Sequence, residues 1–275
     1  MTLAILFLSD CLLWVNRWVA GENEKLPAIL RDLIEQRVAV LATPGSTAIA
    51  LAAKAATQTI PIVFRVGGDP VAMGLVPSLN MPGGNVTGTT TLGVTLGAKR
   101  LQLLRELLTT GATVALFSNP RNANAAAEAK EIDAAAKVLG VRLLVLNATS
   151  PSELDVAFER IAQENVSGLL NAADPFIISQ RDRIVALAAR RAIPGAYSTR
   201  NFLNAGGLIF YGSSGIEEFY TVGTYIGRIL KGEKPGDLPV QQSTKVELAI
   251  NLKVAKAAGI TIPTALLVRA DEVIE

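Results

Sequence analysis

The sequence predicts an α/β protein of two lobes. Half of the residues are apolar but only 5% are aromatic, so Ala, Val, Leu and Ile supply a core of the kind that buried parallel strands and their covering helices need. Short β-branched runs alternate with Ala- and Leu-rich helical patterns, which is the sequence form of repeated βα units. A chain of 275 residues is longer than one typical domain, and the alternation runs in two series, so we expect two lobes.

The first series occupies the N-terminal third of the chain, where helical spacing of apolar residues and Gly or Pro turns mark the boundaries. Its expected elements are a helix from Leu26 that Arg37 ends, a strand at 38–42, a helix at 48–56, and strands at 60–66 and 86–89.

The second series repeats the pattern. We expect helices at 98–108, 123–139 (stopped by Gly140), 152–163 and 179–192, and strands at 113–117, 142–146, 168–171 and 194–197. The remainder is less regular, with a strand at 207–211, a helix at 216–230 and an extended stretch at 245–252. A tail of this kind suits elements that cross back between two lobes.

Composition excludes several kinds of chemistry. The chain has no histidine, which excludes Ser-His-Asp and Cys-His nucleophiles and HExxH zinc sites. Cys11 is the only cysteine, so an intrachain disulfide and a thiolate metal cluster are impossible, and a small buried hydrophobe is its simplest role. No dinucleotide, phosphate-loop or nucleophile-elbow motif occurs, so we expect no cofactor and no metal. The net charge of +2 without a basic stripe argues against nucleic acid as a partner.

Loops that follow the expected strands carry the polar groups of a binding site. Ligands of open parallel sheets bind beyond the carboxyl ends of the strands, where helix N-termini present free N–H groups. Such loops occur in both series, so we expect the site to lie between the lobes. The candidate ligand-binding residues are Thr43, Pro44, Ser46, Gly68, Asp69, Asn119, Asn124, Asp174, Phe176, Tyr197 and Tyr211.

Each candidate also has a structural interpretation. Ser, Thr, Asn and Asp at a helix start are N-caps by default, and Phe176, Tyr197 and Tyr211 suit a core as well as a ligand platform. Asp69 and Asp174 could act as an acid and base pair. Because no histidine, metal cluster or cofactor motif accompanies them, binding is the better hypothesis than catalysis.

These loops resemble those of a known family. The matching segments are 42–44, 60–64 with 68–71, 79–88, 118–120, 173–174, 206–212, 228–233 and 250–253. From about Trp18 to Glu275 the chain resembles the ABC-transporter substrate-binding proteins that include the tryptophan- and tyrosine-binding periplasmic proteins. The resemblance implies a type I periplasmic-binding fold, with two Rossmann-like lobes that close on a ligand. By analogy, residues 1–91 and 212–234 form the first lobe, and 92–211 and 235–275 the second.

The resemblance also implies a function. The chain would be the non-enzymatic solute-binding component of an ABC importer, periplasmic, with a small molecule such as an aromatic or other amino acid as ligand and a membrane permease as partner. Helix N-termini would suit the carboxylate of a zwitterion and an Asp its ammonium group. The alternative is a cytosolic α/β enzyme or a ligand-sensing regulatory protein that uses the same cleft.

The N-terminal segment departs from the family pattern. No signal peptide is recognisable, because Asp10 interrupts the apolar stretch and no basic residue precedes it. Leu3–Leu8 cannot be a parallel neighbour of a strand near 13–18, because about four residues cannot make a right-handed crossover. We therefore expect a first lobe truncated at its N-terminus, in which Leu3–Leu8 either pairs in an unusual, antiparallel position or frays.

Overall fold

The chain forms two compact units in a computed structural model that describes residues 2–8, 11–17, 23–91, 93, 95–213 and 215–275. Unit 1 comprises residues 1–92 and 215–244, and unit 2 comprises 93–214 and 245–275. Residues 235–244 therefore belong to the first unit, whereas the expected boundaries assigned them to the second lobe. The segment 18–22, where the family resemblance begins, lies outside the described residues, as does the side chain of Cys11.

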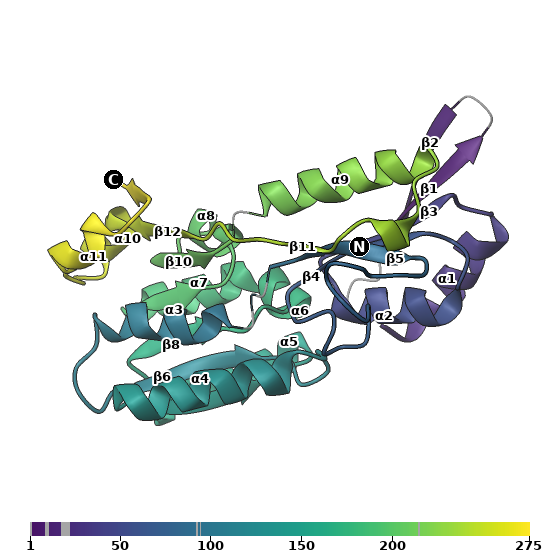
Figure 1. Ribbon diagram of the computed structural model, residues 1–275. Helices are drawn as coiled ribbons and strands as arrows, with labels where there is room; N and C mark the ends of the chain where they lie inside the picture. Colours follow the sequence, from purple (N-terminus) through teal and green to yellow (C-terminus); the bar gives the residue numbers. More distant parts are fainter. Residues whose placement is uncertain (1, 9–10, 18–22, 92, 94, 214) are drawn as a thin grey trace. The chain divides into compact units, whose positions relative to one another are not determined.

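Unit 1 is built on a sheet whose described strands follow the order β11-β5-β4-β3-β1-β2. The strands β3 (Val40–Pro44), β4 (Ile62–Val66), β5 (Val86–Thr90) and β11 (Gln241–Gln242) are parallel. Alternate residues of β3 and β4 face opposite sides, as the two-residue period of a strand requires. Leu41 and Phe64 pack with α1 (Leu26–Glu35) and α2 (Thr47–Ala56), and Val40 and Val63 pack with α9 (Ile216–Leu230). Figure 1 shows α9 on one side of this sheet and α1 and α2 on the other.

The first strand of unit 1 is antiparallel to both of its neighbours. Strand β1 (Thr2–Leu8) pairs with β2 (Cys11–Arg17) and with β3, where Ala4 lies opposite Leu41. This is the antiparallel position that the sequence offered as one of two outcomes for Leu3–Leu8. The hairpin is tied to the rest of the unit by Arg17, whose Nη2 lies 2.9 Å from Asp32 Oδ2 on α1.

Unit 2 is a larger doubly wound layer structure. Its described strands follow the order β13-β12-β10-β9-β8-β6-β7, and neighbours are parallel except for β10 with β12. The strands are β6 (Thr113–Ser118), β7 (Arg142–Asn147), β8 (Gly168–Asn171), β9 (Gly195–Tyr197), β10 (Ile209–Gly212), β12 (Glu247–Asn251) and β13 (Glu272–Ile274).

Helices cover both faces of this sheet (Figure 1). On one side pack α3 (Leu96–Arg105), α4 (Ala125–Leu139), α10 (Leu252–Ala257) and α11 (Thr264–Val268), and on the other α5 (Pro151–Gln163), α7 (Arg181–Arg190) and α8 (Arg200–Asn204). Gly140 ends α4 with a left-handed φ of 63°, as predicted. The helix expected at 179–192 is α7, and a separate short helix that was not predicted, α6 (Pro175–Ser179), precedes it with Asp174 as its N-cap.

Candidate functional site

The carboxyl ends of β3, β4 and β5 place the unit 1 candidates along one edge of its sheet. Thr43 is fully buried at the end of β3, and its Oγ1 has no hydrogen-bond partner among the described residues. Pro44 follows it, and Gly45 takes a φ of 94° that lets the chain turn into α2. Ser46 is the N-cap of α2, and its Oγ accepts a hydrogen bond from Ile49 N at 3.4 Å. Of these residues, only Thr43 keeps a buried polar atom available.

Asp69 acts locally in the loop after β4. Its Oδ1 accepts hydrogen bonds from Val71 N at 2.8 Å and Ala72 N at 3.2 Å, and the residue is exposed. The buried Gly68 accepts at its carbonyl oxygen from Thr90 Oγ1 at 2.8 Å. The carboxylate of Asp69 therefore caps a turn, the structural interpretation of an Asp in such a loop.

Arg65, which the sequence analysis did not select, lies at the same edge. It pairs in register with Pro44 on β3 and with Thr89 on β5. Its guanidinium stands 4.9 Å from the ring centre of Phe219, at the start of α9. Burial lowers the pKa of Arg65, and the nearby carboxylate of Glu218 opposes that shift. A charged residue inside the apolar run 62–66 was the signal that could have found it.

The polar unit 2 candidates meet around Asp174, at the edge where β6 and β8 end. Asp174 is only 2% exposed. Its Oδ1 caps α6 by accepting from Ile177 N at 2.9 Å. Asn119 Nδ2 donates to both carboxylate oxygens, at 3.3 and 3.2 Å, and Asn122 Nδ2 donates to Oδ2 at 2.9 Å. Asn122 also accepts from the backbone N–H of Asn124, the buried N-cap residue of α4, at 3.0 Å.

A buried ion pair supports this cluster from the helical side. Arg100 Nη2 on α3 lies 2.9 Å from Glu128 Oε1 on α4, and the two side chains are 1% and 2% exposed. Burial raises the pKa of Glu128 to about 6 although Arg100 and the N–H of Ala173 oppose the shift, and it lowers the pKa of Arg100. Neither residue was predicted. Both are charged residues at helix positions that face the core, where apolar residues are expected, and this mismatch could have identified them in the sequence.

The aromatic candidates belong to the packing of unit 2. Tyr197 is 1% exposed and stacks on Phe202, with ring centres 4.7 Å apart and planes 5° from parallel. Phe176 and Tyr211 are half-buried against the two hydrophobic clusters on opposite faces of the sheet. These three side chains therefore do not gather at the Asp174 cluster through any contact that the structure describes.

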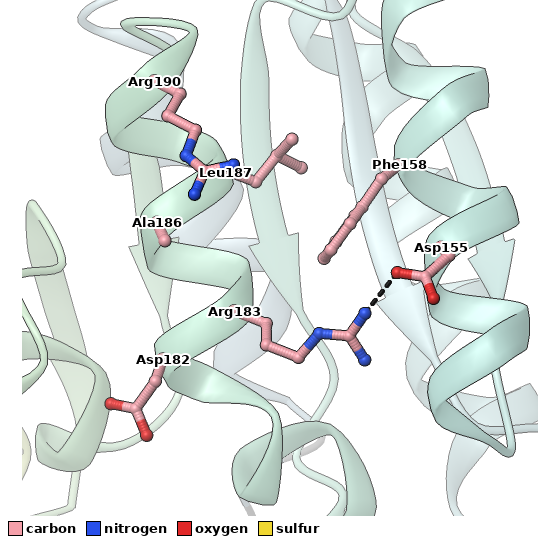
Figure 2. A pocket seen from close by; sticks show the side chains of 7 residues that line it. All are labelled: Asp155, Phe158, Asp182, Arg183, Ala186, Leu187 and Arg190. Carbon is pink, nitrogen blue, oxygen red and sulfur yellow. Dashed lines mark hydrogen bonds and ion pairs between the residues drawn. The ribbon is translucent and has the colours of Figure 1, made fainter.

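A groove on the outer surface of unit 2 contains none of the predicted residues. It has a volume of about 420 Å³ and lies between α5 and α7 (Figure 2). Arg183 spans it, with an ion pair to Asp155 and its guanidinium 5.9 Å from the ring centre of Phe158. Because Phe158 packs edge-on against the buried Phe117, the groove is accounted for as the seam between two helices.

Two other kinds of site are absent from the residues that the structure describes. No helix there is long and apolar enough to cross a membrane, and no group of three or more His, Cys, Asp or Glu side chains is placed to hold a metal ion.

Comparison with known proteins identifies the family. Residues 9–274 match the family described as ABC transporter substrate binding protein. A tyrosine-binding protein of Clostridioides difficile (strain R20291) is 29% identical over 213 residues, which is 77% of this chain. The chain spans 61% of the length of that curated relative.

Two solved structures share the fold. A conserved domain protein from Vibrio cholerae O1 biovar El Tor superimposes with a TM-score of 0.83 and 29% identity, over 91% of this chain and 83% of that one. An ABC domain in complex with L-Trp from Streptococcus pneumoniae gives a TM-score of 0.82 and 24% identity, over 92% and 87%. These likenesses confirm the predicted type I periplasmic-binding fold, and the family match over nearly the whole chain shows that the protein belongs to the ABC transporter substrate-binding protein family.

Proposed function

We propose that this chain is the solute-binding component of an ABC importer and that it captures a small ligand carrying an ammonium group, an amino acid in particular. One observation carries the choice of ligand. The carboxylate of Asp174 is 2% exposed at a strand end and is held by amide and backbone donors, with no ion-pair partner among the described residues.

The electrostatics of the cluster favour a cationic group. Glu128 is compensated by Arg100, so Asp174 is the surplus negative charge of the three. A buried carboxylate that receives only neutral hydrogen bonds is costly, and a charge-assisted interaction with a ligand ammonium would offset that cost. The carboxyl ends of parallel strands are where such folds place their ligands.

We further propose that Thr43 from unit 1 and Asn119 and Asp174 from unit 2 contribute to ligand binding. Thr43 offers a buried hydroxyl that has no hydrogen-bond partner among the residues that the structure describes, and a ligand group could supply the partner that such a buried polar atom needs. The relatives support an amino acid, because one is named for tyrosine binding and another was solved with L-Trp. The proposed partner is a membrane permease, and the proposed location is outside the cytoplasmic membrane.

Titration calorimetry with the purified chain tests the ligand class. L-tryptophan and L-tyrosine are compared with indole-3-propionate, which lacks the amine, and with tryptamine, which lacks the carboxylate. We expect one of the amino acids to bind, and removal of the amine to weaken binding by about tenfold or more, as the loss of a charge-assisted hydrogen bond implies.

Two results would contradict the proposal. One is failure of every L-amino acid in a full panel to bind or to raise the melting temperature, which bound ligand must do. The other is equal affinity for the amine-free analogue, which would exclude the Asp174 cluster as an ammonium site. For the importer role, adjacent permease and ATPase genes support the proposal, and their absence would weaken it.

A further inference from the structure

The buried pair of Arg100 and Glu128 joins more than two helices. The guanidinium and carboxylate lie 2.9 Å apart between α3 and α4. Gly97 on α3 makes room for this close packing, since a Cβ there would stand 2.7 Å from Ile132 Cδ1 and 3.6 Å from Arg100 Nη2. The remaining polar contacts of the pair go to loops and strand ends.

Glu128 holds the loop that carries Asp174. The N–H of Ala173, the residue before Asp174, donates to Glu128 Oε2 at 3.1 Å and to Oε1 at 3.4 Å. Asp174 in turn receives the Asn119 and Asn122 amides. The acceptor on α4 thus fixes the main chain next to the carboxylate on which the ligand proposal rests.

Arg100 contacts the main chain beside two of the three places where the chain passes between the units. Its Nη2 donates to the carbonyl oxygen of Gly93, the first residue of unit 2, at 3.5 Å. Its Nη1 donates to the carbonyl oxygen of Tyr211, near the end of the first segment of unit 2 at Ser214, also at 3.5 Å. These bonds are long and individually weak, but both are made by one buried group that also binds Glu128.

The energetics of buried ion pairs argue against stability as the main role. The cost of removing two charges from water is large, and apolar replacements of similar volume are often neutral or stabilising. The contacts of the pair to Ala173, Gly93 and Tyr211 point to a different role, which is to position the main chain.

We infer that Glu128 is a positioning residue for the Asp174 loop and that Arg100 links this loop to the main chain at Gly93 and Tyr211. The effect on ligand affinity that this inference implies rests on the proposed function. The effect on the order of the loop concerns the chain alone and does not depend on the ligand.

Two double variants isolate the acceptor at position 128. In Arg100→Met with Glu128→Gln, the Gln Oε1 can still accept the Ala173 N–H. In Arg100→Met with Glu128→Leu, that acceptor is absent while both charges are removed as before. Leu104→Ala, a cavity in the same helix α3 at a fully buried position, is the control for lost stability.

Hydrogen exchange of residues 172–177 is measured by mass spectrometry without ligand. We expect the Leu double variant to exchange about tenfold faster here, as loss of one hydrogen bond implies, and the Gln double variant to stay near the wild-type rate. The inference would be overturned if residues 172–177 of the Leu double variant exchanged at the wild-type rate. It would also be overturned if their exchange were accelerated equally in Leu104→Ala at matched stability. If the Leu variant does not fold, Glu128→Asp, whose shorter side chain retracts the acceptor, must show the acceleration instead.

The link to the two passages has its own readout. Arg100→Lys keeps a positive charge beside Glu128, but its single ammonium nitrogen cannot take the places of both Nη1 and Nη2, from which the guanidinium reaches Tyr211 and Gly93. We expect faster exchange at 209–213 and 93–97 with 172–177 unchanged, and unchanged exchange in all three segments would overturn the role of Arg100.

The affinity for L-tryptophan tests whether the position of the loop matters for ligand binding. We expect the Leu double variant to bind about tenfold more weakly, in proportion to the lost protection of the loop, and the Gln double variant to bind like the wild type. Wild-type affinity in the Leu variant would overturn the inference. If the wild type binds no amino acid, the proposed ligand is wrong, and the exchange experiments still decide the positioning role.

Discussion

Asn122 Nδ2 donates to Asp174 Oδ2 across 2.9 Å, so a carboxylate that is 2% exposed is held in place by an amide from a loop 52 residues away. The same carboxylate caps α6 through Ile177 N. Asp174 therefore has two separable properties, its acceptor geometry and its charge, and different substitutions remove them.

Asp174→Asn should weaken L-tryptophan binding by about tenfold or more, because it removes the charge while its amide oxygen can still cap α6. Asp174→Ala should weaken binding equally and cost about 1 kcal/mol more stability, since the cap is lost as well. Calorimetry measures the affinity and urea denaturation the stability. Asp155→Asn, which removes an exposed carboxylate on α5 of the same unit, should leave the affinity unchanged. Wild-type affinity in Asp174→Asn would exclude the ammonium site.

Thr43→Val should stabilise the chain and weaken ligand binding. The Thr43 hydroxyl is buried and has no partner within the described part of the chain. An unsatisfied buried group costs about 1–3 kcal/mol, which the similarly shaped Val avoids. A ligand that uses the hydroxyl loses a hydrogen bond at the same position. Thr43→Ser keeps the hydroxyl and is the control for affinity. A melting temperature that falls in Thr43→Val would show that the hydroxyl is satisfied in solution, and unchanged affinity would remove Thr43 from the site.

Tyr197→Phe should leave both L-tryptophan affinity and stability close to wild type. Burial raises the pKa of Tyr197, and its ring stacks on Phe202 inside unit 2, so the ring supplies the packing. Tyr197→Ala should cost about 3–5 kcal/mol, as large truncations in a core do. Calorimetry and thermal unfolding separate the two roles, and a tenfold loss of affinity in Tyr197→Phe would make Tyr197 a ligand residue after all.

Much of the fold follows from local pattern. The strand 168–171 and the helix 216–230 have the predicted bounds. Gly168 begins the short apolar run of the strand, and Lys231-Gly232 follows the end of the helix. Helix α6 was missed, since five residues after a Pro carry no periodic signal of their own. Chain connectivity narrowed the outcomes for Leu3–Leu8 to an unusual, antiparallel position or fraying, because about four residues cannot make a parallel crossover, and the structure has the antiparallel position.

The candidate site was only partly predictable. Strand ends located Thr43 in unit 1 and Asn119 and Asp174 in unit 2, because the carboxyl ends of parallel strands lie at the same edge of each sheet. Which polar atoms are already occupied depends on partners far apart in the sequence, such as Glu128 and Ala173, 45 residues apart. Asp69 shows the opposite case, since its partners Val71 and Ala72 are local and capping was the simpler prediction.

The pH dependence of stability should report the buried state of Glu128. Burial raises its pKa from the ordinary 4.5 to about 6, while Arg100 and the Ala173 N–H oppose the shift and Asp174 adds to it. The folded chain therefore binds more protons at this group than the unfolded chain between pH 4.5 and 6, so this contribution to stability falls as pH rises through that interval. The shift corresponds to about 2 kcal/mol.

Urea denaturation of the wild type and Glu128→Gln from pH 4 to 8 measures this effect as a difference. We expect the wild type to lose about 2 kcal/mol relative to Glu128→Gln as pH rises from 4 to 7, because Gln stays neutral throughout. Asp32, Glu153, Glu164 and Glu233 have pKa values lowered by hydrogen bonds from neighbouring groups. They stabilise both proteins above their unfolded pKa values and cancel in the difference. A difference that stays constant with pH, or that grows in favour of the wild type, would show that Arg100 more than compensates the burial of Glu128.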